Sequence, residues 1–511
     1  MKFIKKYWLV ILTIITILRL FWSYNLPTYF INNLKLDDRL MIDNFTTLMK
    51  NEYLGPFSEF SLIKGIVFPI TMLIAKSTNI SYSLFYTFLY IFACAYFTCS
   101  LRKIVDDKKV LSIIYIFLLF NPISYSSELF QRLYRNSISI SELLFLLGIT
   151  IRIIKENKIV NYILFGITMT IMFLTREDNI WIFIILLIIS IYKFYKNKKS
   201  ILLCLIPMAI LIINLNIYSA INYNHYGIYT YNVIQKSEFN KTFMKILKIK
   251  ENKKYDKVAI NKDTLYKLSK MTKTFNLSKE DIDTYYKMLA DENGEINNGN
   301  IIWYMRKIID NKNHFKTGCE SEKYYKKLGK EIDKLFEEKE LKSEFILPSI
   351  YIYLPTGKEI KQLPKYILKS ISYTSTYQNV KTIDKLEDSK YKKNIYTNRL
   401  IYLDYNNTEK IAKKNPIRFE IIRIIYKYFT IIFSIISLII YIKNIKTKDK
   451  LNLLIHIILI TYLLILFGVT YTHVTAFPAI RYFYLGNVYI LQNLFILLNI
   501  SRFISSKKMH N

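Results

Sequence analysis

The sequence has 511 residues, of which 52% are hydrophobic and 16% aromatic, and its formal net charge is +33. The apolar residues form long uninterrupted blocks, several of which reach the roughly 20 residues that a helix needs to cross a bilayer. Much of the Lys and Arg lies in short clusters between these blocks, as membrane topology requires, so the charge does not point to a nucleic-acid partner.

Ten apolar blocks with few internal charges are predicted to cross the membrane as helices. They are 7–23, 81–101, 110–122, 138–154, 159–174, 179–195, 201–218, 420–442, 451–469 and 482–500. The first follows Lys2, Lys5 and Lys6 without a small-residue cleavage site, so it is interpreted as an uncleaved span. The block 110–122 is short and is expected to extend past Asn121-Pro122. The predicted fold is an all-α polytopic membrane protein with about ten or eleven transmembrane helices.

Basic clusters at the ends of the blocks predict which side of the membrane each connection occupies. If every block crosses once, all six clusters fall on the cytoplasmic side: Lys2–Lys6, Arg102–Lys109, Arg152–Lys158, Lys193–Lys199, Lys443–Lys450 and Arg502–Lys508. The other side receives 24–80, 123–137, 175–178, 219–419 and 470–481. The expected location is the cell membrane, with a cytoplasmic N-terminus and an extracytoplasmic 219–419 region.

The segment Ser61–Lys76 is also apolar enough to cross. A crossing there would invert every later basic cluster, and the segment contains Lys64 and Pro69. We therefore expect a helix that lies in, or dips into, the outer interface. A true span with a broken topology is the alternative.

The region 219–419 is polar and has no apolar run of spanning length. Within 320–337 apolar residues recur at spacings of three and four, which predicts an amphipathic helix: Tyr325, Leu328, Ile332 and Leu335. Ser278 is a predicted N-cap, with Asp281 three residues later. The region is predicted to be a mainly helical domain, inserted between an N-terminal membrane module (1–218) and C-terminal helices (420–511).

Two adjacent acids, Asp37 and Asp38, follow the first span in the long loop 24–80. A carboxylate can take the proton of an attacking hydroxyl, and acids near lipid are costly unless they are used or solvated. Asp37 and Asp38 are therefore candidate catalytic residues; a solvated acid pair with Arg39 as counter-ion is the alternative. The two carboxylates could also hold Mg²⁺ or Mn²⁺, although nothing in their spacing demands a metal.

Cations on the predicted outer face are candidates for binding a phosphate. Lys64 is a lone cation at an apolar boundary, where the alternative is snorkelling to headgroups. Arg135 and Arg481 are further candidates, because arginine can bind a phosphate through two hydrogen bonds, although Arg481 could be an anchor. Candidate substrate contacts are Arg132, Arg176, Glu177, Asp178 and His473. For Arg176, Glu177 and Asp178 the alternative is an interfacial charge cluster that caps the helix entering at Asn179, with the two acids favoured near its positive end.

The order of these features resembles the first outer loop of the GT-C superfamily of membrane glycosyltransferases. An acid pair after the first span is followed by Gly55-Pro56, then by Lys64 at an interfacial helix, then by a second span. The superfamily includes bacterial aminoarabinose transferases and protein O-mannosyltransferases. The resemblance covers residues 1–105, and the alternation of spans extends it to roughly the first 220 and last 90 residues.

The resemblance implies a polyprenyl-phosphate-linked sugar donor, with Asp37 as the catalytic acid and Lys64 facing the donor phosphate. Asp38 stands where that group often has Glu. Two features depart from the pattern: Gly65-Ile66 replaces a common Pro-Pro pair, and the soluble insert lies between spans. The chain thus looks more like the poorly characterised bacterial members than like either named enzyme, and its substrate stays open.

The expected function is transfer of a sugar from polyprenyl phosphate to an extracytoplasmic acceptor, which would be a cell-envelope glycan, a lipid or a protein. A transporter or flippase for a lipid-linked saccharide is one alternative. Such proteins usually carry intramembrane charges and repeated halves, and the charges here were placed at span ends. A non-catalytic envelope assembly protein is another. Neither Cys/His metal spacing nor a nucleotide-binding, Ser-nucleophile or zinc-helix motif occurs in the sequence.

Overall fold

The computed structural model describes residues 2–24, 26–30, 36–251, 255–347, 349, 352–382 and 417–510. Within these residues the secondary structure is helical, and the only β-type pairings are three isolated bridges. Eight helical segments of the described chain are long and apolar enough to cross a membrane, as expected of a helical multi-pass membrane protein.

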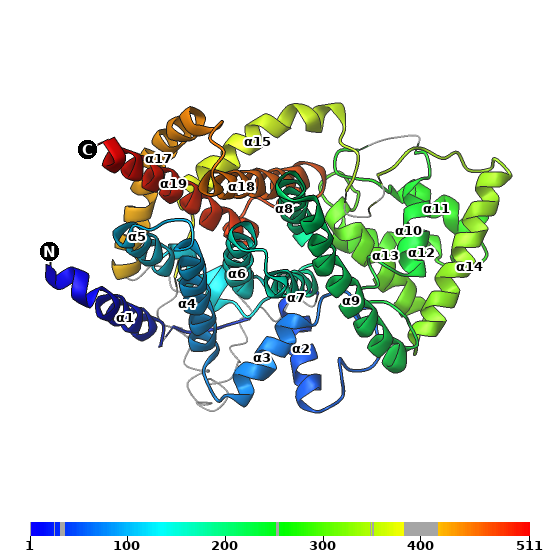
Figure 1. The fold of residues 1–511 in the computed structure, drawn as a ribbon. Helices are drawn as coiled ribbons and strands as arrows, with labels where there is room; N and C mark the ends of the chain where they lie inside the picture. Colours follow the sequence, from blue (N-terminus) through cyan, green and yellow to red (C-terminus); the bar gives the residue numbers. More distant parts are fainter. Residues whose placement is uncertain are drawn as a thin grey trace.

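The apolar helices pack side by side into one bundle, in which the C-terminal helices lie against the N-terminal ones (Figure 1). The bundle helices are α1 (Lys2–Tyr24), α4 (Tyr82–Leu101), α5 (Lys108–Leu119), α6 (Asn136–Lys155), α7 (Ile159–Thr175), α8 (Ile182–Lys196), α9 (Leu205–Tyr226), α17 (Ile417–Asn444), α18 (Lys450–Thr475) and α19 (Tyr482–His510). Every predicted block coincides with one of these helices. The blocks 7–23 and 159–174 correspond to shorter apolar stretches than the other eight.

Burial divides the bundle into a centre and a periphery. In α6 and α19, 89% of the apolar window is buried, whereas in α9 and α17 the share is 22%. The exposed residues of α9 and α17 include many isoleucines, such as Ile213 and Ile435. A helix that keeps apolar side chains on its outer face is suited to contact with lipid, so α6 and α19 form the core and α9 and α17 the rim.

One predicted boundary is wrong and one predicted extension is confirmed. The helix expected over Ser61–Lys76 is only α3 (Val67–Ser77), and residues 61–66 form an irregular turn that carries Lys64. Eleven helical residues span about 16 Å, which is well short of a bilayer core. The block 110–122 extends past Asn121-Pro122, as expected, because the apolar span runs from Lys108 to Tyr125. Helix α5 ends at Leu119, and a 3₁₀ turn capped by the Asn121 side chain follows at Pro122–Tyr125.

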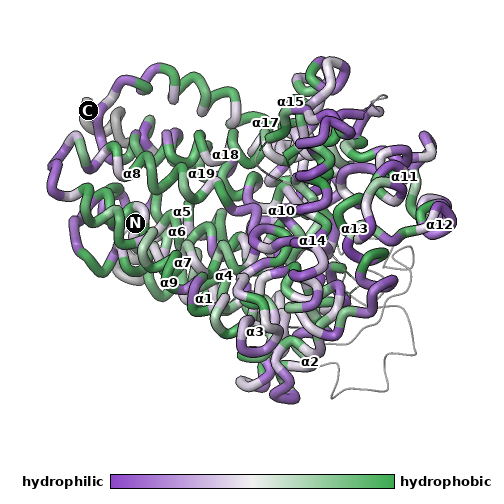
Figure 2. Tube along the Cα trace, turned by 90° about the vertical axis from the view of Figure 1, so that its right-hand side faces the viewer, coloured by the Kyte–Doolittle hydropathy of each residue, from purple (hydrophilic) through white to green (hydrophobic). Residues whose placement is uncertain are grey.

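A separate group of helices follows α9 in the chain. They are α10 (Glu238–Leu247), α11 (Lys262–Met271), α12 (Lys279–Leu289), α13 (Asn298–Asn313) and α14 (Gly318–Glu337). The predicted capping box at Ser278 and Asp281 is confirmed, and all four apolar positions of 320–337 are buried on one face of α14. We call α10–α14 the polar unit, because hydrophilic and hydrophobic residues alternate along it while the bundle is largely hydrophobic (Figure 2).

Helix α15 (Gly357–Ser375) leaves the polar unit and returns to the bundle (Figure 1). Tyr366 contacts His473 of α18, and Ser370 lies 3.1 Å from Thr470 of the same helix. Beyond its end, Tyr377 accepts a 2.6 Å hydrogen bond from Asn493 of α19. The chain therefore rejoins the spanning helices some 60 residues before 419, where the soluble insert was expected to end. Residues 383–416, which form the last part of the expected insert, lie outside the described residues.

Candidate functional site

Segments that are far apart in the sequence meet at one end of the bundle. We call this meeting place the ion-pair cluster. Helix α2 (Asp38–Met49), whose first residue belongs to the cluster, lies beside α3 (Figure 1). The contributing segments are the start of α2, the turn 61–66, the residues 132–136, the turn 175–178, helix α13 and the start of α19.

Asp37 occupies the position just before α2, but its carboxylate does not cap that helix. Its Oδ1 instead accepts a 2.7 Å hydrogen bond from the Tyr134 hydroxyl and lies 3.1 Å from Lys64 Nζ. Although burial opposes ionisation, Lys64, the Tyr134 hydrogen bond and Arg135 together hold the pKa of Asp37 well below its usual range. With 40% of its side chain exposed, Asp37 is an ionised carboxylate that a bound molecule can reach.

Asp38 has a different environment from its neighbour. Its side chain is fully buried, and Arg132 Nε donates to both of its oxygens, at 3.0 and 2.8 Å, while Arg132 Nη2 lies 2.5 Å from Oδ1. The Arg132 guanidinium also packs over the Phe483 ring at 4.7 Å. This pair joins α2 to the 132–136 segment and the start of α19. Asp38 therefore positions α2, whereas Asp37 faces the cluster.

The carboxylates do not suit a metal ion. Asp38 gives both oxygens to Arg132, and Asp37 is already paired with Lys64. In the described part of the chain, no group of three or more His, Cys, Asp or Glu side chains is arranged to hold a metal. The Mg²⁺ or Mn²⁺ considered from the sequence has no support in this geometry.

The turn 61–66 presents Lys64 to Asp37 through several backbone contacts. Leu62 has a left-handed φ of 57°, and its carbonyl accepts a 3.0 Å hydrogen bond from Val233 N. A Cβ on Gly65 would lie 1.6 Å from the carbonyl oxygen of Leu174, at the end of α7. Leu62 has a strained backbone, and Gly65 has no room for a side chain. Together they indicate that the surrounding residues hold the turn 61–66 in one conformation.

Two further arginines of the cluster are paired. Arg135 Nη1 lies 2.6 Å from Glu177, and its Nε donates a 3.2 Å hydrogen bond to the Tyr134 hydroxyl. Arg176 pairs with Asp178 and donates a 2.6 Å hydrogen bond to Asn136. Asp178 does not cap the turn at Asn179, which differs from the capping alternative. Tyr134 thus links Asp37, Lys64 and Arg135 into one network.

Helix α13 of the polar unit completes the cluster, and this contribution was not predicted. The Trp303 ring lies 5.5 Å from Lys64 Nζ, within the range of a cation–π contact. One turn further, the buried Arg306 donates to the carbonyl oxygens of Ser61, at 3.2 Å, and Ser58, at 3.5 Å. The polar unit therefore both covers Lys64 and holds the turn that carries it.

Two of the predicted residues lie outside this network. Arg481 is exposed and forms no ion pair within the described residues; its charge acts on Glu128 and His473. His473 Nδ1 accepts hydrogen bonds from the backbone of Ala479, at 3.1 Å, and Ile480, at 3.3 Å. His473 thereby shapes the loop between α18 and α19, and Arg481 does not join Asp37 and Lys64.

The prediction that all charges lie at the ends of the spans is wrong. Glu142 is buried within α6, where it accepts a 2.5 Å hydrogen bond from Thr175 and its Oε2 has no partner. Arg19 is buried within α1 and donates to the carbonyls of Leu119, at 3.0 Å, and Ser124, at 2.9 Å. Both residues lie inside predicted spans, so inspecting single charges within the blocks could have found them.

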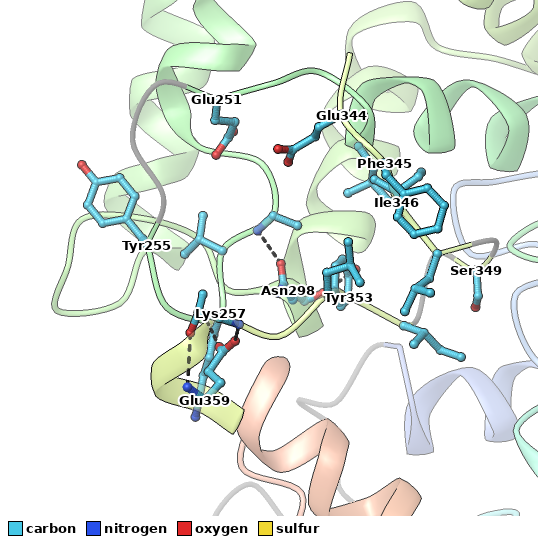
Figure 3. Close-up of a pocket in the computed structure, with 17 residues that line it drawn as sticks. Glu251, Tyr255, Lys257, Asn298, Glu344, Phe345, Ile346, Ser349, Tyr353 and Glu359 are labelled. Carbon is cyan, nitrogen blue, oxygen red and sulfur yellow. Dashed lines mark hydrogen bonds between the residues drawn. The ribbon is translucent and has the colours of Figure 1, made fainter. Parts of the chain in front are cut away.

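A pocket lies elsewhere, between the polar unit and the start of α15 (Figure 3). Glu251 and Glu344 face it on one side, and Phe345 and Ile346 lie on another. Burial raises the pKa of Glu251 to about 7. Its lining includes none of the predicted site residues, so the pocket is not the predicted site.

The chain matches no protein-family model, and no curated protein or solved structure shows a significant match to it.

Proposed function

We propose that this chain is a membrane glycosyltransferase that moves a sugar from a polyprenyl-phosphate donor to an extracytoplasmic acceptor. The observation that carries the proposal is Asp37, a half-exposed, ionised carboxylate among Lys64, Tyr134 and Arg135. A base for an acceptor hydroxyl and cations for a departing phosphate are the groups that such a transfer requires.

The proposed topology has a cytoplasmic N-terminus and an extracytoplasmic cluster. Segments 24–80, 123–137, 175–178 and 219–419 were assigned to one side from their flanking charges, and each supplies a residue to the cluster. Other ion pairs join segments assigned to the cytoplasmic side, such as Lys103–Glu156. Segments that were assigned to the same side contact one another, and this holds for the outer segments and for the cytoplasmic ones. These contacts support the assignment.

Lys64 has two roles in the proposed mechanism. In the free protein it holds Asp37 ionised, and that same attraction makes the carboxylate a weak base. A donor phosphate that binds Lys64 and Arg135 would compete for these cations and raise the pKa of Asp37 towards its ordinary range. Asp37 would then take the acceptor proton more readily, while Lys64 and Arg135 stabilise the charge on the departing phosphate.

Asp37→Asn tests the proposal. The amide keeps the size of the side chain but cannot accept a proton, so sugar transfer from a radiolabelled polyprenyl-phosphate sugar should fall by about 10²–10⁴-fold. The matched control is Asp43→Asn, which changes an exposed acid within α2 that pairs with Arg39. The control should leave transfer unchanged. Equal transfer by wild type and Asp37→Asn would refute the enzymatic role.

A transporter of lipid-linked saccharides is the second candidate, and Glu142 is the observation that favours it. A buried carboxyl group inside a span is typical of membrane proteins that move ions or substrates. In that case proteoliposomes would move the labelled lipid across the bilayer without forming a new glycosidic bond, and Glu142→Gln would abolish the movement. Transfer of label to a new acceptor would instead favour the enzyme.

A further inference from the structure

Helix α15 runs along the bundle in the direction opposite to α18. Going down the chain from Tyr366 to Ser370, its contacts on α18 move from His473 back to Thr470. Ser375 then accepts a 2.8 Å hydrogen bond from Gln492 of α19. Tyr366 and Ser370 thus lie beside the last two turns of α18, next to the loop that joins it to α19. In Figure 2 it lies where the hydrophobic bundle meets the hydrophilic unit.

The face of α15 that points away from the bundle carries two parallel stripes. Lys361, Lys365 and Lys369 follow one another at intervals of four residues and are all exposed. Beside them, also at intervals of four, are the exposed side chains of Ile360, Pro364 and Leu368. Residues four apart lie one above the other on a helix, so each set forms a continuous row.

The lysine row has no acidic counterpart within the described structure. Lys358, one turn earlier, pairs with Asp256 at 2.5 Å, but none of the three lysines forms an ion pair with a described residue. Arg481 adds to this charge, because both Lys369 and Arg481 act on His473. An unpaired cationic row at the outer end of spanning helices is complementary to anionic phosphate groups.

The apolar row is unusually exposed for a folded helix. Leu368 is 67% exposed and Ile360 52% exposed. A helix with lysines on one flank and apolar side chains on the other is suited to the boundary between headgroups and acyl chains. Water would be a poor environment for Leu368, whereas the acyl boundary would bury it beside the lysines.

We propose that α15 is an interfacial helix whose Lys361, Lys365 and Lys369 bind the phosphates of anionic phospholipids while Ile360, Pro364 and Leu368 lie among the acyl chains. This contact does not require the chain to transfer sugar. The contact anchors α15, which follows the polar unit and precedes α17 in the chain, directly to the membrane.

The test uses the full chain in nanodiscs of phosphatidylcholine, with or without phosphatidylglycerol, and native mass spectrometry of the bound lipid. The triple variant Lys361→Gln, Lys365→Gln, Lys369→Gln should bind phosphatidylglycerol about five-fold more weakly for each lysine removed. The matched control changes three exposed lysines of α14, Lys326, Lys327 and Lys330, to Gln and should shift binding less than about two-fold. Equal binding by wild type and the α15 variant, or an equal loss in the control, would overturn the proposal.

Two further arms separate the lipid source and the insertion. Binding that depends on the three lysines should be seen with phosphatidylglycerol. Lysine-dependent binding of polyprenyl phosphate alone would overturn the phospholipid assignment. For insertion, Leu368→Glu should remove the hydrogen-exchange protection that residues 361–372 gain in phosphatidylglycerol discs. Unchanged protection in that variant would show that α15 does not enter the acyl boundary.

Discussion

Two buried carboxyl groups, Asp38 in the ion-pair cluster and Glu251 in the polar unit, have opposite environments. In the cluster, Asp38 and Glu177 each pair with an arginine from another segment. In the polar unit, Glu251 is bound by neutral donors, Asn261 N at 2.6 Å and the Thr264 hydroxyl at 2.9 Å. Other glutamates lie near it, and its pKa is raised. The cluster therefore depends on charges that stay ionised, and the polar unit on a carboxyl group that favours its proton.

The largest effect is expected from breaking the buried pair of the cluster. Asp38→Ala leaves Arg132 buried without its partner, which should lower the free energy of unfolding by about 3–5 kcal/mol. Denaturant unfolding in detergent measures the change. Arg39→Ala removes an exposed pair from the same helix and should cost less than about 1 kcal/mol. Similar losses in the two variants would mean that Arg132 and Asp38 do not hold α2 in place.

An intermediate effect is expected at Gly65. Gly65→Ala would force a methyl group against the Leu174 carbonyl, so either the turn or the end of α7 must move, at a cost of about 1–3 kcal/mol. Because Lys64 is the preceding residue, sugar transfer should fall more than the loss of stability explains. Gly468→Ala in α18, where nothing lies within 4 Å of the added Cβ, is the control. Normal transfer by Gly65→Ala would contradict a fixed position for Lys64.

The smallest effect is a difference in pH dependence. The pKa of Glu251 is about 7 in the folded chain and near 4.5 when unfolded, so the folded state binds more protons between these values. Stability should therefore fall as pH rises through that window, by about 2–3 kcal/mol from this residue.

Glu251→Gln keeps the acceptor oxygen and removes the titration, so its stability should fall less than that of wild type between pH 5 and 7. Glu292→Gln, an exposed acid of the same unit, should behave like wild type. Asp37 has the opposite sign: its lowered pKa stabilises the fold at neutral pH, and this contribution is lost only in acid below its unfolded pKa. Identical pH profiles for Glu251→Gln and wild type would remove the contrast between the two regions.

The spanning helices were predictable because bilayer crossing imposes a length and a composition that can be read locally. The same holds for the capping box at Ser278 and the buried face of α14. The short α3 was harder, because the apolar turn before Val67 is used for packing against α7 and α13 and not for helix.

The candidate site was predictable in part. Asp37 and Lys64 do lie together, as their order in the first loop implied. Trp303 and Arg306 could not be foreseen, because nothing local to a polar helix shows that it will cover a turn about 240 residues earlier. Tyr134 was hidden for a related reason: among 43 tyrosines, only the folded position distinguishes it.

The two hydrogen bonds from Arg306 have a practical consequence for anyone dissecting the chain. They attach the polar unit to the backbone just before Lys64, and two further guanidinium nitrogens of Arg306 have no hydrogen-bond partner. A truncated protein without residues 238–337 would leave the Ser58 and Ser61 carbonyls without their donor and Lys64 without its aromatic cover. The polar unit is thus not a detachable module. A displacement of the unit would be transmitted through Trp303 and Arg306 to Lys64, which lies beside Asp37.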